Sequence, residues 1–309
     1  MENANGTYSL PTIRIHDKDI PLLPGNRLVL KDLEIASLDE IEGLDALPIE
    51  VLDLSGNALE SIVDLGKLPN LGELKVLVLG ENHIGEIEGL NACPGLQDLD
   101  VHANDLLTIA GLDSCQGLRR LNLSGNHLTS TAYEPGPWPT PGLRLLDLSQ
   151  NQIDRIDGLE GLFALGELNL NSNHIVRIEG LEALGRLRSL YLGGNPIAKI
   201  ENVDVLPDLQ DLGLAGCNIS RIEGLDGLAR LKTLGLSNNH ITKIEGLGGL
   251  ERLEDLYLND NEIESLDGLE NLAMLSELQV RNNRIADPSE REKVNGVEVV
   301  DFAGNPFLA

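Results

Sequence analysis

The chain has 309 residues with 23 basic and 50 acidic side chains, so its formal net charge is −27. Such a negative surface argues against direct binding to the phosphates of nucleic acids or to anionic lipids. The chain has no apolar run of the roughly 18 residues that a membrane span requires. Its start, MENANGTYSL, also lacks the basic and apolar segments of a secretory signal. We therefore expect a cytoplasmic protein, or a nuclear one if the source is eukaryotic, with no membrane or nucleic-acid partner.

The first 27 residues lie ahead of the regular part of the sequence. In the stretch YSLPTIRIHDKDIPLLP, which begins at Tyr8, Ile13 and Ile15 alternate with polar residues. Such alternation is typical of a strand with one buried face. We expect residues 1–27 to form an N-terminal cap whose strand covers the first unit of the fold that follows.

A pattern written L-x-L-x-x-N-x-I recurs through residues 28–283 and once more near the end of the chain. Of the eleven intervals between its asparagine positions, nine are 22 residues long and two are 25. A repeat of fixed period predicts stacked structural units that share one continuous core. These asparagine positions are Asn57, Asn82, Asn104, Asn126, Asn151, Asn173, Asn195, Cys217, Asn239, Asn261, Asn283 and Asn305.

Each part of the repeat has a physical role. The two leucines of L-x-L fit a short strand with leucines pointing inward and their neighbours outward. The asparagine amide carries donors and an acceptor that satisfy the backbone groups of a buried turn. The downstream pattern I-x-x-I-E-G-L-x-x-L supplies further apolar positions, and its glycine permits a tight bend. One unit cannot bury these faces alone, so we predict a parallel-stranded α/β solenoid.

The fuller pattern LxxLxLxxNxIxxIxGLxxL resembles the 22-residue class of leucine-rich repeat, from about Leu28 to Phe307. That class includes the protein phosphatase 1 regulatory subunit built of such repeats and, more loosely, bacterial internalin-type proteins. The resemblance implies a horseshoe with a concave parallel sheet of about 13 short strands and irregular or 3-10 convex segments. It also implies that a protein partner docks on the concave sheet face.

The stretch TSTAYEPGPWPTPG, residues 129–142, interrupts the repeat and accounts for one of the two longer intervals. It contains four prolines and the only tryptophan, Trp138. Alternating prolines favour an extended, polyproline-like conformation. Two interpretations of Trp138 are open. It fills the core where the usual leucines are missing, or it forms a second, lateral binding site.

The last part of the chain departs from the repeat again. We expect residues 284–309 to hold the last repeat and a short C-terminal cap, after the repeat array of residues 28–283. Asp287 followed by Pro288 predicts the start of a helix, because proline is favoured in the first helical turn. The final repeat keeps Asn305 at the asparagine position.

Histidine and cysteine positions do not predict a metal or catalytic site. Cys217 replaces a repeat asparagine, and Cys93 and Cys115 on successive repeats are expected to be reduced thiols. Four histidines follow repeat asparagines at least two repeats apart, which is too far to share a metal at a strand spacing of about 4.8 Å. With no Walker motif, nucleophile elbow or legible triad, we expect no enzymatic activity, cofactor or small-molecule substrate. The four histidines are His83, His127, His174 and His240.

Two charged columns follow the flank of the repeats. Facing columns of opposite charge offset the repulsion within each column, and exposed pairs of this kind contribute only about 0–1 kcal/mol each. The basic column contains Arg155, Arg177, Lys199, Arg221 and Lys243, and the acidic column contains Asp157, Glu179, Glu201, Glu223 and Glu245.

The concave face is expected to carry acidic residues without matching bases. Tyr191 and Tyr257 lie between strand leucines three repeats apart, and the two intervening repeats have glycine at this position. We expect both glycines to be bare, so that a partner can approach the sheet backbone closely. Tyrosine is a frequent interface anchor because it offers a large area and a polar tip. We predict a partner-binding site here; the alternative is a merely solvated sheet face. The predicted residues are Tyr191, Tyr257, Asp211, Asp255, Glu277, Gly213, Gly235, Glu167, Asp147, Asp100 and Asp98.

These features predict a non-enzymatic scaffold that binds a protein through its acidic concave face. The phosphatase resemblance implies a regulatory subunit whose partner is a serine/threonine phosphatase catalytic subunit. One alternative is a microbial leucine-rich-repeat protein with an unrelated partner, its acidity reflecting high-salt adaptation or solubility. A purely structural repeat protein is the other.

Overall fold

A computed structural model describes residues 11–308, which divide into two compact units, one ending at Asp147 and the other beginning at Leu148. Residues 1–10, including the start of the predicted N-terminal cap, and Ala309 lie outside the described residues. Both units are built from short parallel strands that follow one another in chain order.

The first unit contains six parallel strands, paired from each repeat to the next. In each pair the central leucines are partners, as in Leu77↔Leu99. The strands are β3 (Arg27–Val29), β4 (Val51–Asp53), β5 (Val76–Val78), β6 (Asp98–Asp100), β7 (Arg120–Asn122) and β8 (Leu145–Asp147).

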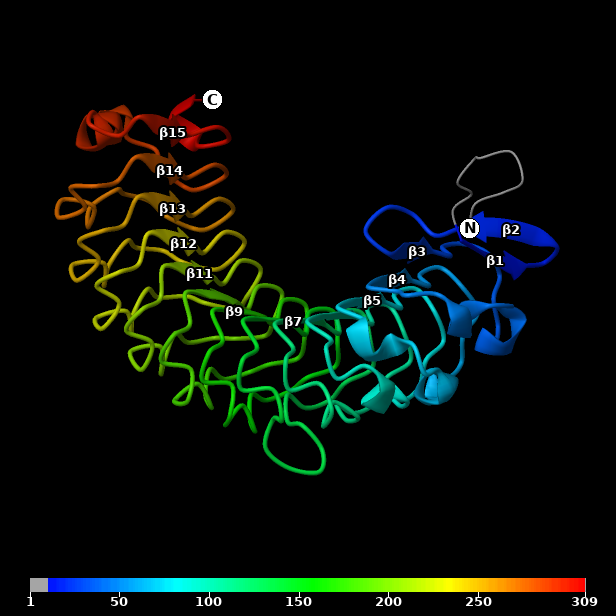
Figure 1. Ribbon diagram of the computed structural model, residues 1–309. Coiled ribbons are helices and arrows are strands. Elements are labelled where there is room, and N and C mark those ends of the chain that lie inside the picture. The colour runs from blue at the N-terminus through cyan, green and yellow to red at the C-terminus, as the bar shows by residue number, and fades with distance from the viewer. Residues whose placement is uncertain (1–10, 309) are drawn as a thin grey trace. The chain divides into compact units, whose positions relative to one another are not determined.

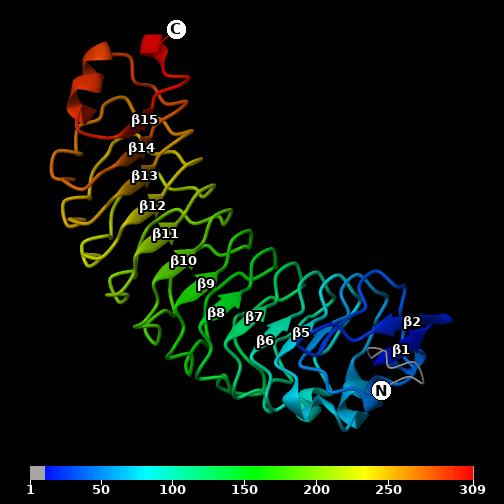
Figure 2. The ribbon, with the colours of Figure 1, turned by 45° about the horizontal axis from the view of Figure 1, so that its top comes forward.

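The second unit contains seven parallel strands in the same register, as Figure 2 shows from β9 to β15. They are β9 (Glu167–Asn169), β10 (Ser189–Tyr191), β11 (Asp211–Gly213), β12 (Thr233–Gly235), β13 (Asp255–Tyr257), β14 (Glu277–Gln279) and β15 (Val299–Asp301). Together the units have the thirteen strands of the predicted solenoid.

The alternation of the repeat places a leucine on the inward face of β3 to β14 and mostly polar side chains on the outward face. The middle leucines of the strands, such as Leu190 and Leu234, are completely buried, whereas the residues on either side of them are partly exposed. Successive side chains of a strand point to opposite faces, so the predicted inward and outward positions are confirmed.

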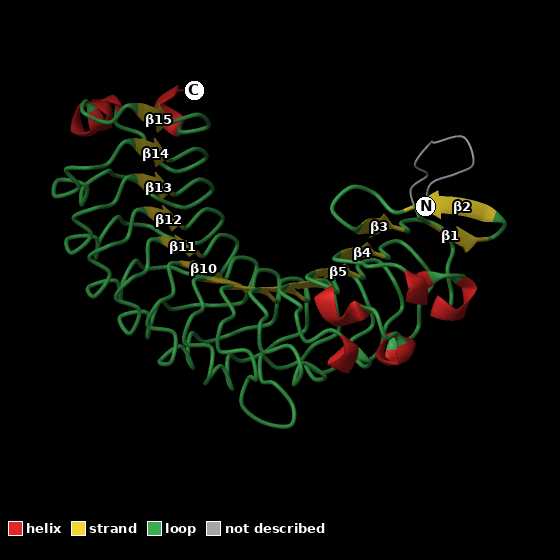
Figure 3. Cartoon of the chain, viewed as in Figure 1, coloured by secondary structure: helices red, strands yellow, loops and turns green. Residues whose placement is uncertain are grey.

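The segments opposite the strands are irregular or form short 3-10 helices, as predicted. Figure 3 shows these helices in the first unit on the side away from its strands. The helices are η1 (Leu38–Glu40), η2 (Leu44–Ala46), η3 (Val63–Lys67), η4 (Leu71–Glu73) and η5 (Leu90–Ala92).

The described N-terminal residues form a hairpin that the sequence did not predict. Strand β1 (Thr12–Ile15) buries Ile13 and Ile15 as expected, and it pairs antiparallel with β2 (Lys18–Pro21). The backbones of Arg14 and Glu42 exchange hydrogen bonds of 3.1 and 3.0 Å, which attach the hairpin to the first repeat.

The C-terminal residues contain η6 (Pro288–Val294) and η7 (Pro306–Leu308). The predicted helix start is confirmed, because Asp287 caps η6 by accepting a hydrogen bond from the Ser289 N–H. The sequence did not indicate that Glu290 would be buried. Its carboxylate accepts from the Leu266 N–H at 2.6 Å and from Lys293 Nζ at 2.7 Å, which links η6 to the preceding repeat.

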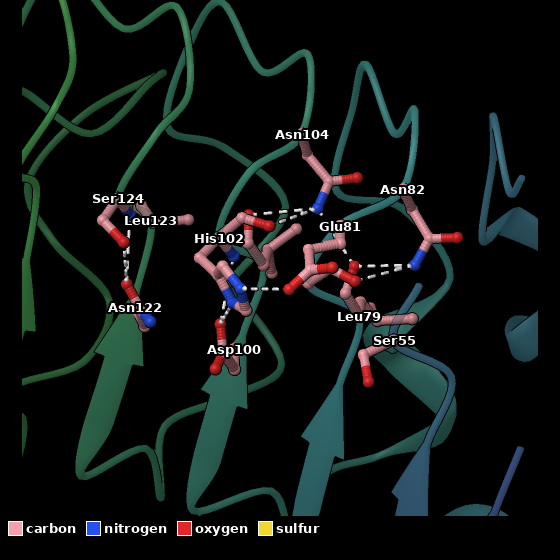
Figure 4. Close-up of polar contacts among 12 residues, drawn as sticks. Ser55, Leu79, Glu81, Asn82, Asp100, His102, Asn104, Asn122, Leu123 and Ser124 are labelled. Atoms are coloured by element: carbon pink, nitrogen blue, oxygen red, sulfur yellow. Dashed lines mark hydrogen bonds and ion pairs between the residues drawn. The ribbon is translucent and has the colours of Figure 1, made fainter. Parts of the chain in front are cut away.

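The repeat asparagines are buried and satisfy the turns that follow the strands. Asn173 is representative: its amide nitrogen donates to the carbonyls of Leu148 and Leu170, both at 3.0 Å, and its amide oxygen accepts from the Ile153 N–H at 3.0 Å. Figure 4 shows Asn82 and Asn104 of successive repeats directing their amides at backbone carbonyls in the same way. Each asparagine therefore joins two repeats as well as closing its own turn.

Cys217 takes the place of a repeat asparagine, and its replacement by asparagine should stabilise the protein. Its thiol lies 3.5 Å from the Leu192 carbonyl, the place where asparagine donates in other repeats, and burial raises its pKa. Cys217→Asn should raise the free energy of unfolding by about 0.5–1.5 kcal/mol, because it supplies stronger donors and an acceptor to the same buried groups. Chemical denaturation measures this. The same replacement at buried Cys93, which is not at an asparagine position, should destabilise the protein. Equal effects at both positions would contradict the role of position 217 in binding the backbone of the turn.

The inserted stretch of residues 129–142 contributes to the core. Trp138 is 3% exposed and its ring centroid lies 5.8 Å from that of Tyr133, so the core-filling interpretation is confirmed. The Tyr133 hydroxyl donates to Asp113 at 2.8 Å and accepts from the Leu112 N–H at 3.0 Å. The expected polyproline-like conformation is wrong: the chain turns repeatedly here, since both aromatic rings must reach back into the core.

Candidate functional site

The exposed sheet face is the side of each unit's strands that points away from the leucine core. Every residue of the predicted binding site is on a strand and faces this side. These residues are distributed over both units. The second unit holds Glu167, Tyr191, Asp211, Gly213, Gly235, Asp255, Tyr257 and Glu277, and the first holds Asp98, Asp100 and Asp147.

In the second unit the two tyrosines and two glycines form one row across four strands. The pairing Tyr191↔Gly213↔Gly235↔Tyr257 matches the predicted order. The two glycines differ, however. A Cβ atom on Gly213 would lie 3.0 Å from Cδ1 of Tyr191, whereas one on Gly235 would meet only backbone atoms at 3.8 Å or more. The prediction of two bare glycines is thus wrong for Gly213, because the Tyr191 ring covers it; Gly235 is the open backbone.

A second row carries carboxylates separated by hydroxyl side chains, except that Asp255 and Glu277 are direct neighbours. The Ser189 hydroxyl donates to Asp211 at 2.8 Å, and the Thr233 hydroxyl lies 3.4 Å from Asp255. The amide nitrogen of Gln279 donates to Glu277 at 2.6 Å. These neutral donors orient the carboxylates and leave their negative charge in place.

Burial and the neighbouring negative charges together raise pKa values along this row and the tyrosine row beside it. Burial raises the pKa of Asp255, and the charges of Glu277 and Glu254 raise it further. The pKa of Tyr257 is raised by burial and then by Asp255 and Glu277. Burial, followed by the charges of Asp211 and Glu167, also raises the pKa of Tyr191, although its hydrogen bond with Ser189 opposes this. A positive group placed here would relieve the repulsion.

The first unit contradicts the expectation of acids without matching bases. The Arg120 guanidinium makes two hydrogen bonds to Asp98, of 2.8 and 2.7 Å, which raise the pKa of Arg120. The sequence placed both residues in one outward column. Their strands pair Asp98↔Arg120 directly, so the exposed Arg120 side chain reaches the carboxylate on the neighbouring strand.

The His102–Asp100 pair is a feature that the sequence analysis missed. His102 Nδ1 lies 2.7 Å from Asp100 Oδ1, and its Nε2 lies 3.7 Å from Glu81, as Figure 4 shows. The imidazole occupies space above Gly80, where a Cβ atom would lie 2.1 Å from the ring. Gly80 and His102 occupy the same position of successive repeats, and this glycine before a histidine could have indicated in the sequence that the imidazole would pack over the glycine.

The flank columns pair as expected, but partly between neighbouring repeats. Arg155 pairs with Asp157 at 2.8 Å within its own repeat. Arg177 instead reaches Glu201 at 3.1 Å, and Arg221 reaches Glu245 at 3.0 Å, each on the following repeat. These contacts are exposed, so they contribute little to stability.

The remaining histidines and cysteines add no site. His83 and His127 each lie 3.5 Å from Asp105 on the intervening repeat. Residues 11–308 contain no group of three His, Cys, Asp or Glu side chains arranged to hold a metal ion. Cys93 and Cys115 are buried, and burial raises their pKa values to about 11 and about 12. Within residues 11–308 no helix has the length and apolar character needed to cross a membrane.

Family models match two parts of the chain. Residues 117–136 match a leucine-rich repeat, and residues 229–271 match a model of two such repeats. A search of curated proteins finds no significant match.

Solved structures extend this similarity over most of the chain. An internalin, InlF, of Listeria monocytogenes is 26% identical over 93% of this chain and 90% of that chain, with a TM-score of 0.68. A leucine-rich-repeat protein of Leptospira interrogans is 28% identical over 82% of this chain and 72% of that chain, with a TM-score of 0.70. A chain of the octameric complex of latrophilin 3, Unc5D and FLRT2, which includes leucine-rich repeats of FLRT2, is 22% identical over 82% of this chain and 83% of that chain. Its TM-score of 0.71 shows likeness of fold alone. The matched repeats and the parallel strands together establish that this chain contains leucine-rich repeats and has a leucine-rich-repeat fold.

Proposed function

We propose that the protein is a non-enzymatic scaffold that binds a protein partner through the exposed sheet face of its second unit. Leucine-rich-repeat proteins generally act as protein-binding scaffolds, and FLRT2, which has this fold, is part of a multiprotein complex. The observation that carries the proposal is the row in which Tyr191 and Tyr257 enclose the open backbone of Gly235.

This row combines the features of an interface anchor. The tyrosines offer large, partly buried rings whose ordering costs little entropy. Gly235 lets a partner approach the sheet closely. The adjacent Asp211, Asp255 and Glu277 favour a basic or mixed partner surface, which would reduce the repulsion among these carboxylates that adds to burial in raising the pKa of Asp255. Electrostatic attraction of this kind speeds association most at low salt.

A serine/threonine phosphatase catalytic subunit is the specific partner that the sequence resemblance favours, and the role is then regulatory. The similarity to the Listeria internalin favours a second candidate, an internalin-type repeat protein with an unrelated partner. Calorimetric titration with a purified phosphatase catalytic subunit separates the two, because only the first predicts binding.

Replacing Tyr191 and Tyr257 together by alanine should weaken partner binding about tenfold or more, which corresponds to about 1.4 kcal/mol. Both rings lie on the exposed sheet face, so the variant should remain folded. Affinity capture with the wild type and the variant, followed by mass spectrometry and calorimetry of the captured protein, measures the loss.

The control variant replaces Arg221 and Glu223 on the flank by alanine and should bind normally. Partner binding that survives the double tyrosine change and falls in the flank variant would place the site elsewhere. If the acidity reflects high-salt adaptation instead, molar salt should stabilise the wild type markedly against unfolding. The binding proposal expects good stability at low salt.

A further inference from the structure

The exposed sheet face of the first unit contains a hollow of about 260 Å³ over β5 to β8. Its apolar lining includes Val76, Val78 and Leu145, all of them outward strand residues that are partly exposed. Asp98 and Arg120 lie between the valines and the leucine.

Strand β5 is aliphatic at both of its outward positions, whereas Val29, Val51 and Val299 each stand beside a polar residue on their own strands. The first and third residues of β9 to β14 in the second unit are polar, glycine or tyrosine. Valine is favoured in strands, which alone could explain one such residue, but leucine has no comparable preference. Three aliphatic side chains that share one hollow leave an apolar surface that the solenoid does not need for its own core.

The ion pair at the centre of the hollow makes it suitable for an apolar group. The two hydrogen bonds between Arg120 and Asp98 neutralise both charges within the unit. An entering apolar side chain would therefore not strand an unpaired charge, which is the costly case.

Two acidic residues flank the valine end of the hollow. The pairing Asp53↔Val78↔Asp100 places one carboxylate on each side of Val78. Asp53 accepts hydrogen bonds from Ser55 through Oδ1, and Asp100 accepts from the His102 N–H through its own Oδ1. These contacts do not use the Oδ2 atoms, which can accept from a positively charged donor.

We propose that this hollow binds a segment of a protein partner that packs an aliphatic or aromatic side chain against Val76, Val78 and Leu145. The same segment places a lysine or arginine between Asp53 and Asp100. The inference rests on the proposed scaffold function and adds a second contact surface with a defined partner chemistry, separate from the tyrosine row of the second unit.

The test is selection of random twelve-residue peptides displayed on phage against the full chain, followed by fluorescence anisotropy with the synthetic peptides. Selected peptides should carry an aliphatic or aromatic residue beside lysine or arginine. Val76→Thr with Val78→Thr keeps the shape and strand preference, and it should weaken binding at least fivefold. Asp53→Asn with Asp100→Asn should weaken binding and reduce its salt dependence. The matched control, Val176→Thr at an exposed valine outside the strands of the second unit, should leave the affinity unchanged.

Three results would overturn the hollow as a binding site: no peptide is selected, the selected peptides are acidic, or the valine variant binds them with unchanged affinity. Peptides that lose affinity only in the double tyrosine variant would refute the hollow and leave the scaffold proposal standing. If the scaffold proposal itself is wrong, the wild type, the tyrosine variant and the valine variant should all capture the same proteins.

Discussion

Replacing Trp138 by alanine should lower the free energy of unfolding by about 3–5 kcal/mol, the range found for removing a large aromatic side chain from a core. The ring is 3% exposed and packs beside Tyr133 in the inserted stretch. Its loss leaves a cavity that the surrounding repeats fill only in part. Urea denaturation followed by circular dichroism measures the change.

Trp138→Phe is the control for this prediction. The indole N–H of Trp138 is buried without a hydrogen-bond partner among the described residues, so phenylalanine removes an unsatisfied donor and keeps an aromatic ring in place. We expect a much smaller loss of stability than with alanine. A nearly neutral Trp138→Ala would contradict the core role and revive the interpretation of a lateral binding site.

Asn173→Ala in the middle of the repeats should destabilise the protein by about 1–3 kcal/mol. The change removes one of two asparagine donors from each of the Leu148 and Leu170 carbonyls, which keep Asn151 and Asn195, respectively. It leaves the Ile153 N–H without its acceptor in a buried turn. A buried polar group without a partner cannot form a hydrogen bond to water instead. The expected loss in the free energy of unfolding therefore exceeds that from removing one exposed contact. The midpoint of chemical denaturation gives the value.

The neighbouring residue provides the comparison. His174 is exposed, and its backbone N–H donates to the Ile153 carbonyl, a bond that alanine retains. His174→Ala should be nearly neutral. Equal losses at Asn173 and His174 would mean that the inward register of the repeat is misassigned.

The sequence by itself determined the repeat, the strand register and the inward positions. A strand has a period of two and the repeat has a nearly constant length, so one alignment places the repeat leucines in the core and the repeat asparagines at turns. The same reasoning put Tyr191, Gly213, Gly235 and Tyr257 in one row, which the strand pairing reproduces.

Only the tertiary structure decided which neighbouring residues the long side chains contact in the space between repeats. Tyr191 covers Gly213, Arg120 neutralises Asp98, and Arg177 pairs with an acid on the next repeat. The sequence pattern brings each of these side chains near several neighbours about 5 Å apart. Which neighbour it contacts depends on its rotamer and on the room left by adjacent repeats, such as the absence of a side chain on Gly213. The strand pattern therefore locates the outward columns, whereas the packing of their side chains decides where charge is neutralised and where backbone or apolar surface stays open.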